Sequence, residues 1–367
     1  SNRRSKSWQW SQEFRVTTDF KGPFNGVAGV YYFTEAVKNV TSFFFGSADP
    51  TIFTTTVLRP RYRQETTGFA AYAQGTYQLT EQFAITAGVR ATQEEKSFDL
   101  VSNRETPGQL SPAITLPGAV ITNVLPFSSR TADYDNVSGR IALDYQATDD
   151  LMLFASVSQG FRAGGFNGGA NTSPLQLNEI EPETLIAYEA GLKSDWFDGR
   201  LPANVTAFRY DYQDLQVTQF VTIPGAGATG GLVLTVDNAA NAEVQGLELE
   251  FQVRPVSAFE AGLNLAFLET EYQDYVIARG TPAARDLSGN RLLGAPEFDA
   301  SGYMQYTHTV GLGELVFRLD GTHKGSVWFD ADQRVAVARE VPSYTVLNAS
   351  VALSAEDWTF RLWSRSI

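Results

Sequence analysis

The 367-residue chain contains no cysteine and only two histidines. Without cysteine, neither a disulfide framework nor a thiolate metal site can form. No stretch approaches the roughly eighteen consecutive apolar residues that a transmembrane helix needs. Charged residues make up 19% of the chain, below the roughly 25% that is usual for soluble domains. These absences leave open a membrane protein that crosses the bilayer with short alternating strands.

Several functional classes are disfavoured by the charge and by the few histidines. The net charge of -13 argues against a nucleic-acid partner, because phosphate binding needs a basic surface. His308 and His323 lie on different segments, and the sequence points to no supporting ligands or catalytic partners around them. The sequence therefore predicts a protein that is not an enzyme and that holds no metal or cofactor.

Apolar residues alternate with polar ones over most of the chain. Between Gly68 and Glu94, apolar side chains recur at every second residue on both sides of a short break at 80–82. Period two across a tight turn predicts an antiparallel hairpin. The unit recurs, for example around Ile141 and Leu153 and around Leu249 and Leu263. We expect about fourteen strands in seven hairpins.

Connections of two lengths alternate along the predicted strands. Short turns follow one end of each hairpin, and long polar connections join the hairpins to one another at 34–66, 96–135, 160–180, 221–234, 270–296 and 322–342. Several exceed the roughly 12–15 residues that compact soluble domains tolerate. Outer-membrane barrels combine short periplasmic turns with long extracellular loops. The predicted fold is therefore all-β, an antiparallel transmembrane β-barrel.

The main structural alternative is a soluble β-sandwich or β-helix with long loops. It shares the alternation but does not explain why long and short connections alternate. It would also bury Arg90, Arg140 and Glu248, at a cost of several kcal/mol each if they were unpaired. A barrel lets these side chains face an aqueous interior.

Several segments, in this order, resemble TonB-dependent outer-membrane receptors. They are Ser11 to Val16, Gly26 to Phe33, Leu151 to Asn167, Glu181 to Thr184, Tyr188 to Ser194, Asn238 to Ala240, Val244 to Glu248, Leu287 to Arg291 and Ala295 to Glu297. The resemblance covers nearly the whole chain.

The resemblance implies a barrel of about twenty-two strands around an N-terminal plug, which couples to the TonB energy-coupling complex. We find nothing like the plug, so we expect residues 1–367 to form a single partial barrel domain. The plug, the early strands and the last strand would be absent, and the sheet would be open or incompletely closed.

Recognition is expected in the long extracellular loops, where arginine offers a forked donor and aromatic rings offer flat apolar contact. The candidate ligand-binding residues are Arg59, Arg61, Tyr62, Arg63, Phe161, Arg162, Phe166, Asn167, Trp328 and Phe329. Two alternatives stay open. The glycines of 160–167 favour a strand-to-loop bend over ligand contact. The arginine run at 59–63 equally suits a solvated loop or a contact to anionic lipopolysaccharide.

The functional hypothesis is energised uptake of a large, scarce solute across the outer membrane of a Gram-negative bacterium. The resemblance makes a ferric siderophore the first choice, and outer-membrane lipid and lipopolysaccharide are further expected partners. A passive porin-type channel is the first alternative, followed by a barrel enzyme and a secreted adhesin.

Overall fold

The computed structural model describes residues 2–45, 56–106, 120–168, 174–222, 232–278, 284–333 and 340–365. Its main feature is one sheet whose neighbours follow chain order, and every described pairing is antiparallel. The strands of this path are β1 (Asn2–Thr17), β2 (Phe24–Phe45), β3 (Thr56–Gln78), β4 (Phe83–Thr106), β5 (Val120–Thr148), β6 (Leu151–Arg162), β9 (Glu183–Trp196), β10 (Leu201–Thr222), β11 (Leu232–Val256), β12 (Phe259–Ile277), β14 (Phe298–Val310), β15 (Gly313–Lys324), β18 (Tyr344–Ser354) and β19 (Thr359–Arg365). The seven predicted hairpins are confirmed.

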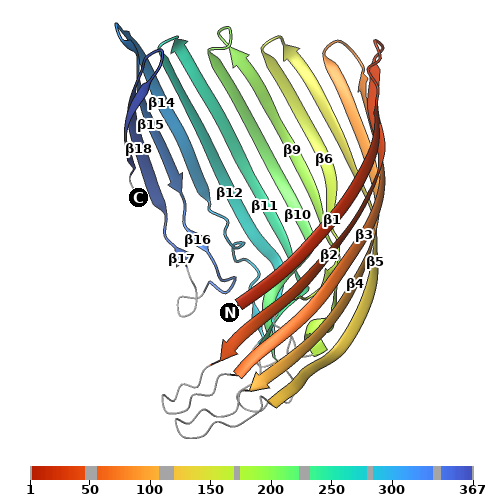
Figure 1. Ribbon diagram of the computed structural model, residues 1–367. Helices are drawn as coiled ribbons and strands as arrows, with labels where there is room; N and C mark the ends of the chain where they lie inside the picture. Colours follow the sequence, from red (N-terminus) through yellow and green to blue (C-terminus); the bar gives the residue numbers. More distant parts are fainter. Residues whose placement is uncertain are drawn as a thin grey trace, which may run out of the picture.

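The sheet curves into an arc of barrel wall that stays open between β1 and β19 (Figure 1). The short turns lie together at one end of the arc, and the long connections lie at the other. The remaining elements are short: β7 (Gly165–Phe166), η1 (Pro174–Leu177), β8 (Glu179–Ile180), β13 (Arg285–Asp286), β16 (Val327–Trp328) and β17 (Glu340–Val341). Among the residues above, no helix has the length and apolar character to cross a membrane.

The predicted apolar rows form an exposed band on the convex face of the sheet. On β5, Val137, Ile141 and Leu143 are 64%, 57% and 38% exposed. Cross-strand partners share a face, so the unbroken register joins Ile141 to Val157 on β6 and to Ala87 on β4. On most strands the band covers roughly nine residues, the length that a tilted strand needs to cross a bilayer. We call it the apolar belt.

The opposite, concave face carries the polar side chains that a sandwich would have had to bury. The Arg90 guanidinium lies 5.9 Å and 5.8 Å from the ring centres of Tyr31 and Tyr72. The Tyr72 hydroxyl donates a 2.6 Å hydrogen bond to Glu13. No second layer covers the apolar belt in the described structure, which is the arrangement of a membrane barrel wall.

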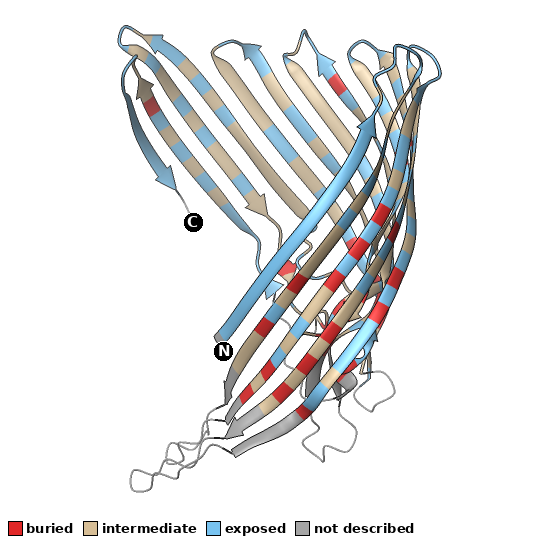
Figure 2. Cartoon of the chain, turned by 45° about the vertical axis from the view of Figure 1, so that its right-hand side comes forward, coloured by how far each residue is buried: buried red, intermediate tan, exposed pale blue. Residues whose placement is uncertain are grey.

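Two of the predicted long loops are wrong, because 34–66 and 96–135 are mostly strand. β2 to β5 run far past the apolar belt, and β5 alone has 29 residues. The alternation continues there, but its phase inverts: Phe98 and Leu100 on the concave face are 1% exposed, while Asp99 lies between them on the convex face. The polar residues that predict loops at these positions are strand residues instead, at the point where the buried face of the strand changes side. We call this extension of the sheet beyond the belt the rim (Figure 2).

Candidate functional site

The concave face of the rim holds most of the buried side chains. Figure 2 shows buried positions concentrated along the lower parts of β3 to β5. These strands are long enough to carry a core of their own once the chain between β6 and β9 folds against them. The rim is therefore the part of the molecule where a fixed binding surface can be built.

The first apolar cluster covers β4 and β5 and takes in the chain that follows β6. Phe98 stacks on Phe166 of β7 with ring centres 5.6 Å apart, and it meets Tyr62 of β3 at 5.5 Å. The other buried members are Leu100, Leu125, Ala132, Tyr134 and Leu177. Residues 163–168 and 174–180 are thus folded inward against the sheet, where they narrow the lumen, and we call them the first inward segment.

A lysine and a tyrosine tie this inward segment to the sheet. Lys96 Nζ donates a 2.8 Å hydrogen bond to the Gly164 carbonyl oxygen and lies 5.5 Å from the Tyr134 ring centre. Burial, with the Glu179 carboxylate nearby, raises the pKa of Tyr134 well above its ordinary value. The phenol therefore stays protonated. A Cβ at Gly164 would overlap the backbone oxygen of Ile180, so only glycine fits this bend.

The second apolar cluster lies against β10 to β12. Tyr272 and Tyr275 lie with ring centres 4.8 Å apart, together with Val217, Ala240, Ala242 and Leu287. Burial, Tyr272 and Asp330 raise the pKa of Tyr275 to about 12. Asp332, 4% exposed, forms an ion pair with Arg285. The segments 285–297 and 327–333 therefore form a second fixed inward structure.

A set of amide hydrogen bonds joins the first inward segment to β10 and β11. Asn238 Oδ1 accepts a 2.8 Å hydrogen bond from the Glu181 backbone N–H, and Asn238 Nδ2 lies 2.8 Å from the backbone oxygens of Glu181 and Asp214. Gln216 Nε2 donates to the carbonyl oxygens of Ala163 and Glu181. We call Asn238 and Gln216 the amide latch. Glu181 and Asn238 belong to motifs noted in the sequence, and here they hold structure.

Replacing Asn238 with alanine is expected to loosen the first inward segment by about 1–3 kcal/mol, because it leaves the Glu181 backbone N–H and the Asp214 carbonyl oxygen without their side-chain partner. Limited proteolysis of the folded protein should then cut this segment faster. Asn178 to alanine is the control, since Asn178 is exposed and outside the latch. Equal cleavage rates in the two variants would contradict the role of the latch.

The predicted site residues do not converge on one place. Arg59, Arg61 and Arg63 lie on β3, not in a loop, and the continuous register puts them on the convex face with Phe69. Phe161 lies near the end of β6 on the same face as Val157. Their side chains therefore point away from the lumen, so the loop placement is wrong for these four residues.

The remaining predicted residues face the concave side or belong to the inward segments. Tyr62 and Phe166 lie in the first cluster, and Asn167 is 9% exposed beside it. Arg162 is exposed at the end of β6. Trp328 lies on β16, and Phe329 follows it with 62% of its surface exposed.

Sequence reasoning missed Lys96, Tyr134, Tyr272 and the amide latch. The inverted alternation was a usable signal for Phe98 and Tyr134, since polar residues flank each of them: Ser97 and Asp99 in the first case, Asp133 and Asp135 in the second. For the latch the signal is weak, because Asn238 and Gln216 lie on different strands and meet a third segment.

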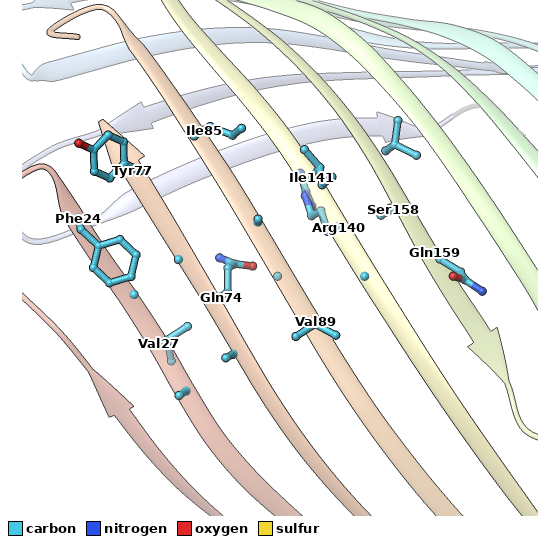
Figure 3. A pocket seen from close by; sticks show the side chains of 18 of the residues that line it. Phe24, Val27, Gln74, Tyr77, Ile85, Val89, Arg140, Ile141, Ser158 and Gln159 are labelled. Atoms are coloured by element: carbon cyan, nitrogen blue, oxygen red, sulfur yellow. The ribbon is translucent and has the colours of Figure 1, made fainter. Parts of the chain in front are cut away.

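One large hollow of the described surface lies away from the rim. It measures about 1100 Å³ and is lined mostly by side chains of the apolar belt (Figure 3). Small residues such as Gly75, Ala73 and Ala87 leave the space between Phe24, Tyr77, Ile85 and Ile141. An apolar depression on the convex face suits hydrocarbon chains and offers no route for a polar solute.

The match to a known family covers almost the whole chain. A sequence profile described as "TonB dependent receptor-like, beta-barrel" matches residues 1–364. The pesticin receptor of Yersinia enterocolitica is 24% identical over 288 residues, which are 78% of this chain and 37% of that protein. The metal-pseudopaline receptor CntO of Pseudomonas aeruginosa is 31% identical over 169 residues, or 44% of this chain and 20% of that protein. The chain thus spans little more than a third of the first relative's length.

Solved structures share the arrangement of the strands. The ferric yersiniabactin uptake receptor FyuA from Yersinia pestis superposes with a TM-score of 0.76 at 21% identity, covering 99% of this chain and 49% of that one. The siderophore receptor PiuA from Acinetobacter baumannii gives 0.60 at 14% identity, covering 92% of this chain and 52% of that one. At these sequence identities, the similarity to the two solved structures is a similarity of fold.

Proposed function

Because the chain belongs to the TonB-dependent receptor β-barrel family of the Gram-negative outer membrane, we propose that the protein it forms part of imports a large, scarce solute. The barrel provides the outer wall, and the rim captures the solute from the medium. Energy for release into the lumen would come through the TonB complex. The match over residues 1–364 is the observation that carries this proposal.

The inward segments favour a receptor over a passive porin-type channel. Both segments are held by buried contacts: Phe166 on Phe98 in the first, and Asp332 with Arg285 in the second. A fixed, folded constriction at the outer end of the lumen restricts free diffusion. It also offers a preformed surface on which a solute can be bound with little loss of conformational entropy.

A ferric siderophore is the proposed cargo. This choice is supported by two solved structures that are named as receptors of such compounds, the ferric yersiniabactin receptor and the siderophore receptor PiuA. Their identities of 21% and 14% leave the particular siderophore open.

We assign first contact with the solute to Arg162, Trp328 and Phe329. Arg162 is exposed on the concave side of β6, and Phe329 is exposed within the second inward structure. A guanidinium and two aromatic rings suit an anionic chelate with flat apolar parts. Phe166 and Asn167 are buried, so we assign them a role in supporting this surface in place of the ligand contact that the sequence predicts.

Uptake of iron-55-labelled siderophores by iron-limited cells tests the proposal. Cells that carry the full-length protein should accumulate label from one siderophore class, and dissipating the proton-motive force should abolish accumulation without abolishing surface binding. Arg162 to alanine should lower binding by roughly tenfold, the value of one charge-assisted contact. Accumulation that persists after energy depletion would support the porin alternative instead.

A further inference from the structure

One edge of β5 has no partner strand along the rim. β5 pairs with β4 over almost its whole length, but its pairing with β6 ends where Arg140 meets Ser158. Beyond that point β6 pairs with β9 alone and ends at Arg162, while β5 continues past it (Figure 1). Between residues 128 and 137 the register of β5 with β4 is regular, and no described strand pairs with its other side. We call residues 128–137 the open edge.

The first inward segment leaves the open edge uncovered. It packs on the concave face of β5 through the side chains of Ala132 and Tyr134. Among the described residues, no backbone hydrogen bond joins the open edge to any segment other than β4. Alternate residues of an edge strand turn their N–H and C=O groups outward, so about half of the open edge presents unpaired donors and acceptors.

The open edge is long and uninterrupted. Most sheet edges are short, or are interrupted by proline or a β-bulge. Pro126 and the register irregularity of β5 lie beyond the outer end of the open edge, so neither interrupts it. The range 128–137 also exceeds the roughly five to six residues of an average strand. An added strand therefore finds enough unpaired backbone groups to bind.

The charges on the convex side determine which strand fits the open edge. Asp133 and Asp135 are exposed there, and Glu95 of β4 is the cross-strand neighbour of Asp133. None of these three carboxylates forms an ion pair with another described residue. A second copy of the chain, paired antiparallel about Tyr134, would set Asp133 opposite Asp135 and be destabilised by the like charges. The open edge therefore selects a strand whose side chains on the convex side are basic.

We propose that the open edge binds an extended, basic polypeptide segment, which joins the wall as an additional strand beside β5. Backbone hydrogen bonds to the unpaired N–H and C=O groups hold the segment in register. Lysine or arginine at every second position then forms ion pairs with Asp133 and Asp135. The rim faces the medium, so the segment belongs to a peptide or protein that arrives from outside the cell. The site is independent of the solute that the lumen receives.

Fluorescence anisotropy with a labelled synthetic peptide tests the site on the full-length, detergent-purified protein. The probe is a twelve-residue peptide in which lysine alternates with threonine, and we expect saturable binding at concentrations up to about 1 mM. Two further peptides carry N-methyl groups on every lysine or on every threonine backbone nitrogen, which removes alternate backbone donors and leaves the charge intact. At least one of them should bind roughly tenfold or more weakly, since each backbone hydrogen bond contributes about fivefold.

Substitution of the two aspartates tests the selection by charge. The variant D133N/D135N should bind the lysine–threonine peptide about fivefold more weakly, because each exposed ion pair contributes only a small part of the affinity. The matched control D211N/E243Q removes two acidic side chains from β10 and β11, which have partner strands on both sides at these positions. It should bind the peptide normally. Heat-modifiable gel mobility establishes that each variant is a folded barrel.

Hydrogen exchange measured by mass spectrometry locates the bound peptide. The amides of residues 128–137 should exchange more slowly when the peptide is present, and those of β10 to β12 should not change. Undiminished binding of both methylated peptides would overturn the proposal, as would protection confined to other strands or the absence of saturable binding. An equal loss of affinity in the aspartate variant and the control variant would also overturn it.

Discussion

Replacing Phe166 with alanine is expected to destabilise the packing of the first inward segment on the rim by about 3–5 kcal/mol, the usual cost of removing a buried phenylalanine side chain. Phe166 is 8% exposed and stacks on Phe98, which is itself 1% exposed. The segment should then detach from β4 and β5. We expect rapid cleavage there in limited proteolysis, and a drop of about tenfold or more in solute affinity, because binding would have to order the segment again.

Phe161 provides the matched control for this experiment. It is the same residue type five positions earlier, but its side chain lies on the convex face with Val157. Phe161 to alanine should leave both proteolysis and solute affinity close to those of the unsubstituted protein. Similar behaviour of the two variants would mean that the first inward segment is not held by Phe166.

A second large effect is expected at the apolar belt. Leu263 on β12 is 43% exposed on the convex face, between Ala261 and Leu265. Arginine at this position would place a charge against hydrocarbon, which costs about 2–4 kcal/mol near the middle of the bilayer. The full-length protein should therefore fold into phospholipid bilayers with a lower yield, and it should unfold at a lower urea concentration.

Asn264 is the neighbouring residue on the opposite face and gives the comparison. Its side chain lies 3.4 Å from Ser301 Oγ on the concave side, where water is available to an arginine. Asn264 to arginine should change the urea midpoint by an amount worth less than about 1 kcal/mol. If both variants were destabilised equally, the assignment of the convex face to lipid would be wrong.

The belt could be predicted from the sequence because each of its strands repeats one local pattern. Ile141 and Leu143 on β5, or Leu249 and Phe251 on β11, alternate with polar neighbours over the length that a membrane requires. The short turns between such strands follow from the same pattern. The same pattern determines the register of neighbouring strands, because a slip of one residue would turn every apolar side chain of a strand toward water.

The rim could not be predicted in the same way, because two environments meet within one strand. Along β3 the apolar positions change from Phe69 and Ala71 on the convex face to Leu58 and Tyr62 on the concave face. The periodicity persists, but a single window across the change shows no clear period. The polar residues between the two patterns then look like the start of a loop.

The residues of the site could not be predicted for a further reason, which is that they lie far apart along the chain. The amide latch connects Gln216 of β10 and Asn238 of β11 to the two ends of the first inward segment, at residues 163 and 181. No local sequence pattern records such a meeting. The sequence predicts a ligand-binding role for the arginine run at 59–63 and places it in a loop. The direction in which these side chains point depends on the register of β3, which extends through a range predicted to be a loop.

The length of β5 sets how far the protein reaches from the cell. About seventeen residues precede Val137, the last outward apolar residue of the belt on that strand, and at about 3.3 Å each they extend roughly 55 Å along the strand. After allowing for a tilt of about 40°, the hairpin of β4 and β5 extends about 40 Å beyond the apolar belt. A diffusing solute can therefore meet the protein well outside the hydrocarbon layer, before it reaches the mouth of the lumen.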